Sequence, residues 1–413
     1  MAARRIETVR MTLATCVAIA LLFPASGASA ARLDVTPSLS LDQVYDSNVF
    51  NTDGNEKGDF IFRATPADTF SLKMPETTLN LRSSLTSDTY YKYSERNSRT
   101  SAITLALDSQ PPIPLSPRFS ISPSGHFVQA RDSYFRTQFV PTADPLVPAS
   151  IASETAVRKT RDYGAALRIN YLVTPKTEFS LGGGFSKLQF LDNNAIDNTS
   201  GDVDSRVVTG DTTLTYKFTP RLSSGVFVNT AYNTFENGRD SRTLAGGLTG
   251  SYLYSPSFTM TARAGASRAQ ESGVSGVAER TTWSPYGLLK LAYLDNTFRA
   301  SLTGSVDQSG GGSLGFTTQR ESITLSLTNQ FATHWWGDLS GNYQVNKSLD
   351  AVTSEDLTSA AGTAGIRYQP LQWATLRLTG TAFRQWSNGT VGSDLTRYSA
   401  FLGVTVGSTY NIY

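Results

Sequence analysis

The chain has 413 residues, 36 lysines and arginines against 34 aspartates and glutamates, and one cysteine, Cys16. This balance provides no net field that would draw the protein to nucleic acid, so no nucleic-acid partner is predicted. A single cysteine excludes an internal disulfide.

The amino-terminal segment has the pattern of a secretory leader. Arg4, Arg5 and Arg10 precede an apolar run at residues 11–23, and Ala28-Ser29-Ala30 supplies small residues for cleavage. The run is too short for a membrane-spanning helix. We therefore predict a signal peptide at residues 1–30, whose removal eliminates Cys16, and one domain at residues 31–413, because no linker or change of period divides the rest.

From residue 160 onward, apolar and polar side chains alternate with the period of two that is typical of β-strands. In residues 322–331, for example, Ile323 and Leu325 share one face while Thr324 and Ser326 share the other. Strands of about 10–13 residues fit a tilted membrane crossing better than a soluble sandwich, whose strands are commonly 5–6 residues long.

Short and long connections also alternate. Short turns are predicted near residues 174–175, 219–220, 255–256, 295–296, 332–333 and 369–370, and longer loops near 191–205, 236–241, 270–280, 308–318, 348–357 and 387–395.

This layout predicts an all-β fold, a transmembrane antiparallel up-and-down barrel in the outer membrane. Early strands are expected at 33–45, 59–72, 77–94, 99–108 and 118–130, although Pro37, Pro66 and Pro123 interrupt them. With thirteen later strands the total is 18, and 16 is the alternative.

Aromatic residues support the same fold. The chain ends on an alternating strand with Tyr413 as its last residue, which resembles the insertion signal of outer-membrane barrels. An interfacial girdle is expected beside the short turns. Its predicted members are Tyr171, Tyr216, Tyr252, Tyr254, Tyr293, Tyr368, Trp335 and Trp373.

The polar strand faces predict the residues that line a pore. The cations assigned to this face outnumber the acids, which favours anions unless the charges pair across strands. The predicted lining residues are Arg63, Arg82, Arg118, Arg168, Lys217, Arg263, Lys290, Arg299, Arg367 and Arg377, with the acids Glu178, Asp211, Asp307 and Asp338.

Other chemistry has weak support. His126 lies near Ser122 and Ser124, but residues this close on one strand do not readily face each other and no third orienting group is evident. His334 has no obvious partner.

The acidic segments 192–204 and 46–55 lack calcium-loop spacing, and the glycines at 310–312 lack the context of a phosphate loop. We predict no enzyme activity, no metal and no cofactor. The long segment 131–160 either constricts the lumen or extends outward.

Tyr45-Asp-Ser-Asn-Val-Phe50 resembles the Tyr-Asp-x-Asn-Val/Ile-Phe/Tyr motif of a family of outer-membrane β-barrel porins often encoded beside exopolysaccharide secretion genes. The resemblance implies a pore that exports a cell-surface polysaccharide. The alternatives are a diffusion porin for small anionic solutes and a barrel that anchors an enzyme or adhesin. Expected partners are outer-membrane lipid, the barrel-assembly machinery, polysaccharide and periplasmic export components.

Overall fold

The computed structural model describes residues 31–131, 159–191, 203–236, 238, 240–272, 279–310, 317–349, 356–388 and 394–412. The predicted leader at 1–30, most of the long segment 131–160, residues 192–202 and Tyr413 lie outside the described residues. The expectations attached to those segments stay predictions.

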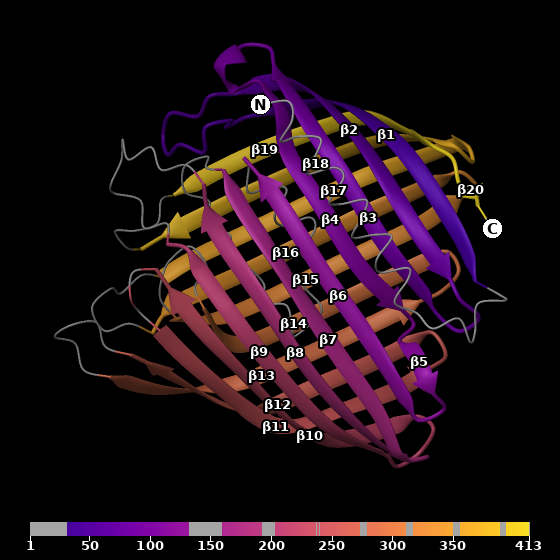
Figure 1. The fold of residues 1–413 in the computed structure, drawn as a ribbon. Coiled ribbons are helices and arrows are strands. Elements are labelled where there is room, and N and C mark those ends of the chain that lie inside the picture. The colour runs from indigo at the N-terminus through magenta and orange to yellow at the C-terminus, as the bar shows by residue number, and fades with distance from the viewer. Residues whose placement is uncertain are drawn as a thin grey trace, which may run out of the picture.

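The described residues form one antiparallel sheet that closes on itself (Figure 1). Eighteen long strands follow one another around the barrel, and β1 pairs with β19 to complete the ring. These strands are β1 (Arg32–Asp46), β2 (Asp59–Lys73), β3 (Thr78–Tyr90), β4 (Ser98–Gln110), β6 (Phe119–Ala130), β7 (Thr160–Thr174), β8 (Thr177–Phe190), β9 (Ser205–Lys217), β10 (Leu222–Phe235), β11 (Asp240–Ser255), β12 (Phe258–Glu271), β13 (Arg280–Leu294), β14 (Phe298–Gly310), β15 (Thr317–Ala332), β16 (Trp335–Ser348), β17 (Asp356–Leu371), β18 (Ala374–Ser387) and β19 (Leu395–Gly407).

Two short strands lie outside this ring sequence. β5 (Ile113–Ser116) pairs with the start of β6, between the strands predicted at 99–108 and 118–130, and β20 (Tyr410–Asn411) pairs with β1. The predicted strand at 77–94 ends earlier, at Tyr90, and the 3-10 turn η2 (Ser94–Arg96) follows. Eighteen membrane-crossing strands are therefore confirmed.

The three early prolines lie where a ladder is interrupted. Pro66 falls in a gap between β2 and β3, whose pairing stops at Ala64 and resumes at Ala67. Pro37 falls between the end of the β19 ladder and the short β20 ladder, and Pro123 lies just beyond the end of the β4 ladder. Proline lacks an N–H to donate, so these positions are the ones at which a barrel strand tolerates it.

The connections follow the predicted alternation. Pro175 and Lys176 alone separate β7 from β8, whereas residues 191–204 separate β8 from β9. The short turns and the end of β19 lie at one end of the barrel and the longer connections at the other (Figure 1). In outer-membrane barrels the short-turn end is periplasmic and the long-loop end is extracellular.

The outer face is apolar at the level of the membrane. Leu248, Leu402 and Ile323 are more than half exposed, as are many other strand residues that point away from the barrel. At the short-turn end, Tyr171, Tyr216, Tyr252, Tyr254, Tyr293, Trp335 and Trp373 are all exposed, and the ring of Tyr368 stacks on that of Trp335 with centroids 4.4 Å apart. The predicted aromatic girdle is thus present. The protein is an outer-membrane β-barrel.

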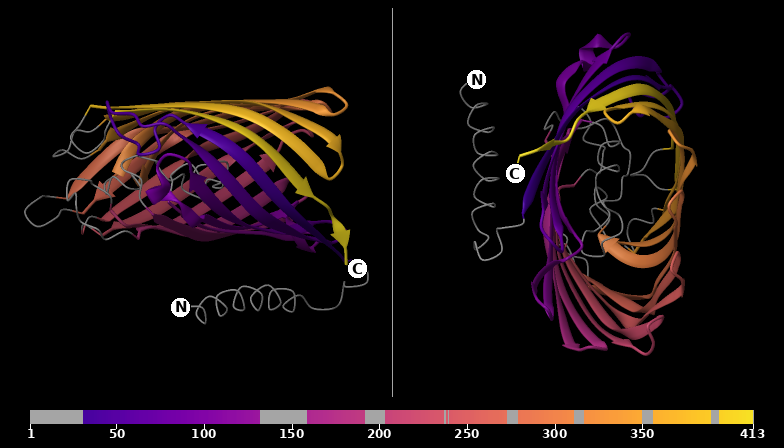
Figure 2. Two further views of the ribbon diagram at one scale, coloured as in Figure 1. Left: turned by 90° about the horizontal axis from the view of Figure 1, so that it is seen from above. Right: turned by 90° about the vertical axis from the view of Figure 1, so that its right-hand side faces the viewer.

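Within the described residues, no helix is both long and apolar enough to span a membrane. The cross-section of the barrel is oval when it is seen from the short-turn end (Figure 2, right). The first strands and β19 lie at one narrow end, and the strands β10–β12 lie at the other.

Candidate functional site: the interior of the barrel

The two-residue period fixes which side chains face the interior. On β1, Leu39 and Leu41 are exposed on the outer face, so Ser40 and Asp42 face inward. Directly paired residues of neighbouring strands share a face. The strand registers therefore show which residues of each successive strand face inward. Arg63 on β2, for example, faces inward because it is paired with Asp42.

Most of the predicted lining cations form ion pairs in the interior. The pairs among predicted residues are Arg168 and Arg263 with Asp211, Lys217 with Glu178, and Arg367 with Asp338. Asp307 pairs with Arg320, which the sequence analysis did not single out. Three further predicted cations pair with acids that were also missed: Arg63 with Asp88, Arg82 with Asp108, and Arg377 with Asp42.

The interior holds more acids than the sequence analysis assigned to it. Asp34, Asp42, Asp46, Asp88 and Asp108 all lie on the inward face of the first four strands. Pro37 interrupts the alternation in β1, which carries Asp34, Asp42 and Asp46. Asp88 and Asp108 lie on β3 and β4, which contain no proline, and the sequence analysis missed them as well. The register of β1 with β19 and β2 shows the inward face directly.

In the described interior pairs of Arg or Lys with an acid, the acid is the less accessible partner except in Arg320–Asp307, where the cation is 13% exposed and the acid 23%. The side chain of Asp34 is 4% exposed, whereas its partners Arg32 and Lys73 are each 51% exposed. Asp42 is 5% exposed and its partner Arg377 41%. A short carboxylate lies against the wall, while the longer guanidinium or ammonium group reaches past it toward the interior. Asp42, for example, lies over Gly403, where the absence of a Cβ leaves room for the carboxylate. The interior surface is therefore more basic than the residue count implies.

Three predicted cations have no ion pair within the described residues. Lys290 on β13 and Arg299 on β14 face inward, toward the short-turn half of the barrel, where they are paired in register with Thr303 and Thr328. Arg299 is exposed and Lys290 is partly exposed. Arg118 lies in the turn before β6 rather than within a strand. These groups add positive charge that no described carboxylate neutralises.

An aromatic pair fills the interior at the narrow end formed by β10–β13. Phe227 is 1% exposed, and its ring centroid lies 5.1 Å from that of Tyr286. Gly247 and Gly265 occupy the same cross-strand row between these two residues. A Cβ on either glycine would lie 2.1 Å from a carbonyl oxygen of the neighbouring strand. The sharply bent wall thus requires glycine, and the rings cover the space that the glycines leave.

Arg263 connects this aromatic pair to the ion pairs of the interior. The guanidinium of Arg263 lies over the Phe227 ring, 5.1 Å from its centroid, and pairs with Asp211 at 3.6 Å. Asp211 also pairs with Arg168 at 3.4 Å. One carboxylate that is 3% exposed therefore holds two arginines.

The motif residues 45–50 lie at the opposite narrow end, where the barrel closes. Asp46 accepts hydrogen bonds from the guanidinium of Arg397 on β19, with Nε–Oδ2 at 3.0 Å. Asn48 is fully buried: its amide group donates to the backbone carbonyls of Thr52 and Thr396 at 2.8 and 3.2 Å, and its oxygen accepts the Thr52 N–H. The motif therefore binds the first loop, residues 47–58, to the last long strand, β19, at its junction with β1.

Apolar packing supports the same junction. Val44, Val49, Ile61, Tyr90 and Phe401 form a buried cluster there. Phe50 packs edge-on against Tyr93 with centroids 5.0 Å apart. Residues of β1, β2, β3, β19 and the first loop thus share a small core inside the barrel.

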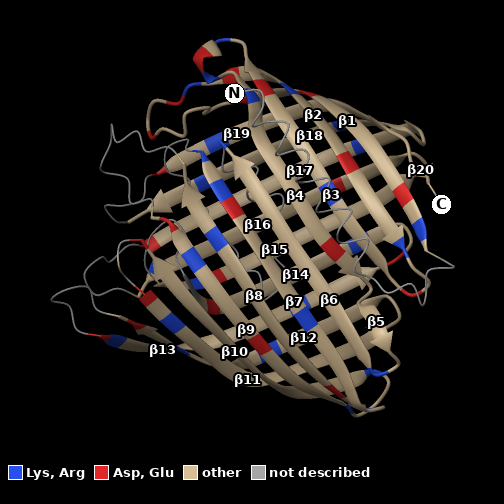
Figure 3. Ribbon diagram, viewed as in Figure 1, with Lys and Arg blue, Asp and Glu red and all other residues tan. Residues whose placement is uncertain are grey.

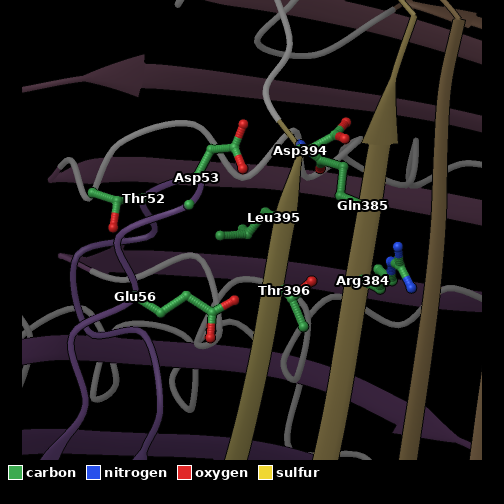
Figure 4. A pocket seen from close by; sticks show the side chains of 9 residues that line it. Thr52, Asp53, Glu56, Arg384, Gln385, Asp394, Leu395 and Thr396 are labelled. Carbon is green, nitrogen blue, oxygen red and sulfur yellow. The ribbon is translucent and has the colours of Figure 1, made fainter.

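A shallow pocket lies beside this loop at the long-loop end (Figure 4). Asp53 and Glu56 line it from the loop, and Asp394 and Leu395 line it from the start of β19. Three carboxylates line the pocket, yet no group of His, Cys, Asp or Glu among the described residues is placed to hold a metal ion.

The histidines do not adopt the arrangement considered from the sequence. Nε2 of His126 lies 3.2 Å from Oδ1 of Asp162 on β7, with both side chains 7% exposed. Within the described residues, neither Ser122 nor Ser124 forms a hydrogen bond with His126, whose side chain contacts Asp162 instead. His334 lies in the turn between β15 and β16, where its carbonyl accepts the Gln369 N–H.

The chain is similar in shape to several solved structures, at low identity. OpdK of Pseudomonas aeruginosa with vanillate is 11% identical, with 91% of this chain and 99% of that chain covered and a TM-score of 0.43. OccAB3 of Acinetobacter baumannii is 9% identical, with 92% and 99% covered and a TM-score of 0.45. OccK2 (OpdF) of P. aeruginosa with glucuronate is 10% identical, with 92% and 98% covered and a TM-score of 0.46. No protein-family model and no curated protein matches the chain.

Proposed function

We propose that this barrel is a passive channel for small anionic solutes. The observation that carries the proposal is the unequal exposure within the interior ion pairs. Asp34, Asp42 and Asp211 are buried against the wall, while the cations paired with them project inward. A solute in the lumen meets guanidinium and ammonium groups first, and a confined channel strengthens their field.

The packed ends of the oval favour small solutes over a polymer. Phe227 and Tyr286 occupy one narrow end, and the cluster around Val44 and Ile61 occupies the other. Both reduce the cross-section that remains for a permeant molecule.

Export of a polysaccharide, the function that the resemblance of residues 45–50 implies, draws no support from the contacts of that motif. Its Asp46 and Asn48 are engaged in closing the barrel and in anchoring the first loop. Neither side chain is free to contact a permeant molecule.

The test is the reversal potential of single channels in a planar bilayer across a salt gradient. The wild-type protein should prefer anions. The double variant Lys290→Gln/Arg299→Gln should shift the reversal potential toward cations, because both cations face the interior without an ion pair among the described residues. Arg384→Gln is the matched control, since Arg384 lies on the outer face with its guanidinium over the Trp386 ring. A wild-type channel that prefers cations, or a double variant indistinguishable from the control, would contradict the proposal.

A further inference from the structure

The outer face of β7–β12 carries a group of cations near the long-loop end of the barrel. This outer basic patch consists of Arg161 on β7, Lys187 on β8, Arg206 on β9, Arg242 on β11 and Arg268 on β12. Figure 3 shows Lys and Arg recurring toward this end of the strands.

The registers place the patch on the lipid-facing side. Arg242 is paired with Tyr232, which is 47% exposed, and Arg268 is paired with Leu244 and with Trp283, which is 69% exposed. The guanidinium of Arg206 lies over the ring of Phe185, 5.2 Å from its centroid. Aromatic residues at this level mark the boundary between hydrocarbon and headgroups.

Few described acids lie beside the patch. None of its five cations forms an ion pair with a described residue, and the guanidinium of Arg161 instead donates to the side-chain oxygen of Gln129 at 3.1 Å. Asp240 is the one described acid on the outer face of β7–β12, and it accepts the hydroxyl hydrogen of Tyr232 at 2.9 Å.

Two of these cations face each other directly. Lys187 and Arg206 are cross-strand partners. Like charges in this position destabilise a sheet unless an anion lies between them. A carboxylate on either strand would supply that anion, but the outward positions of these strands provide none among the described residues. An external anion fits this arrangement.

The same strands have no such feature at their other end. The outward residues beside the short turns are mainly aromatic or aliphatic, among them Tyr171, Tyr216, Tyr252 and Tyr254. The protein therefore presents a basic surface to one membrane leaflet and an aromatic surface to the other. Arginine and lysine bind phosphate groups through charge-assisted hydrogen bonds.

We propose that the outer basic patch binds the phosphate groups of a phosphorylated glycolipid in the extracellular leaflet. The long side chains extend along the wall to the headgroup level, with their apolar stems against the barrel and their charged ends at the phosphates. Lys187 and Arg206 hold one phosphate between them, and Arg242 and Arg268 bind along the neighbouring strands.

The experiment is native mass spectrometry of the detergent-solubilised mature barrel with bisphosphorylated lipid A. The triple variant Lys187→Gln/Arg206→Gln/Arg242→Gln should bind it about a hundredfold more weakly, since each cation near an anionic headgroup contributes roughly a factor of five. Lipid A from which both phosphates have been removed should bind the wild-type protein as weakly as lipid A binds the variant. Folding of each variant is checked by its heat-dependent shift in gel mobility.

Lys290→Gln/Arg299→Gln is the matched control, because it removes cations from the inner face and should leave lipid A binding unchanged. Equal binding by the triple variant and the wild-type protein would overturn the proposal. So would equal losses in the triple variant and the inner-face control, or equal wild-type affinity for phosphatidylglycerol, since a bulk charge effect would then suffice. Channel conductance is measured separately, so a negative result for lipid A binding would not contradict the proposed channel function.

Discussion

The two narrow ends of the oval are held by different kinds of contact. At the junction of β1 and β19, residues from opposite ends of the sequence are joined by the Arg397–Asp46 ion pair, the buried Asn48 and a small apolar core. At the other end, consecutive strands bend over Gly247 and Gly265, and aromatic rings cover them. Consecutive strands are close in sequence and pair locally. A bend between them therefore requires only glycines, whose missing side chains leave room for the neighbouring backbone. The junction between distant strands is held by specific polar partners.

The largest expected effect is at the junction. Arg397→Met leaves the Asp46 carboxylate, which is 3% exposed, without its charged partner, so the free energy of unfolding should fall by about 3–5 kcal/mol. Urea titration of the barrel in lipid vesicles, followed by tryptophan fluorescence, measures this change. Arg367→Met is the control, because Arg367 and Asp338 are 42% and 35% exposed and their pair should contribute less than about 1 kcal/mol. Similar losses in both variants would show that the junction has no special role.

A smaller effect is expected at the glycine corner. Gly247→Ala places a Cβ against the carbonyl oxygen of Ala264, so the wall must shift, which should cost about 1–3 kcal/mol. Gly304→Ala is the control, since its Cβ would have no neighbour within 4 Å. The same urea titration compares the two variants. If Gly247→Ala is as stable as Gly304→Ala, the bend does not depend on glycine.

The smallest effect concerns the loop rather than the barrel. Asn48→Ala removes the side-chain bonds to Thr52 and Thr396, and should lower the stability of the loop by about 0.5–1.5 kcal/mol. Limited proteolysis between residues 49 and 58 should become faster while the urea midpoint of the barrel changes little. Asn229→Ala, on a different part of the barrel wall, is the control and should leave proteolysis of the first loop unchanged. Unchanged cleavage in Asn48→Ala would show that the motif does not anchor the loop.

The strands from β7 onward were predictable because little interrupts the alternation of side chains. In residues 322–331 every apolar residue falls on the outward face of β15, and the girdle tyrosines lie beside the turns that the sequence indicates. Strand number followed from the same pattern together with the even count that closure of such a barrel requires.

The interior was harder to predict, for two physical reasons. Pro37 interrupts the pattern in β1, which makes the inward face of Asp42 hard to assign, whereas Asp88 was missed on β3, which contains no proline. In addition, exposure within a pair depends on side-chain length and on neighbours such as Gly403, which the sequence alone does not bring next to Asp42. Phe227 also faces inward despite being apolar, because Gly247 and Gly265 create a site for its ring.

Solute flux into proteoliposomes tests the central claim most directly. The purified barrel is reconstituted, and uptake is compared for a uronic acid, a neutral sugar of the same size and a series of uronate oligomers of increasing length. The interior described above predicts faster uptake of the monomeric uronate than of the neutral sugar, and a steep fall in rate as the oligomers lengthen. Uptake of long oligomers at the rate of the monomer would contradict a small-solute channel and would favour polysaccharide export.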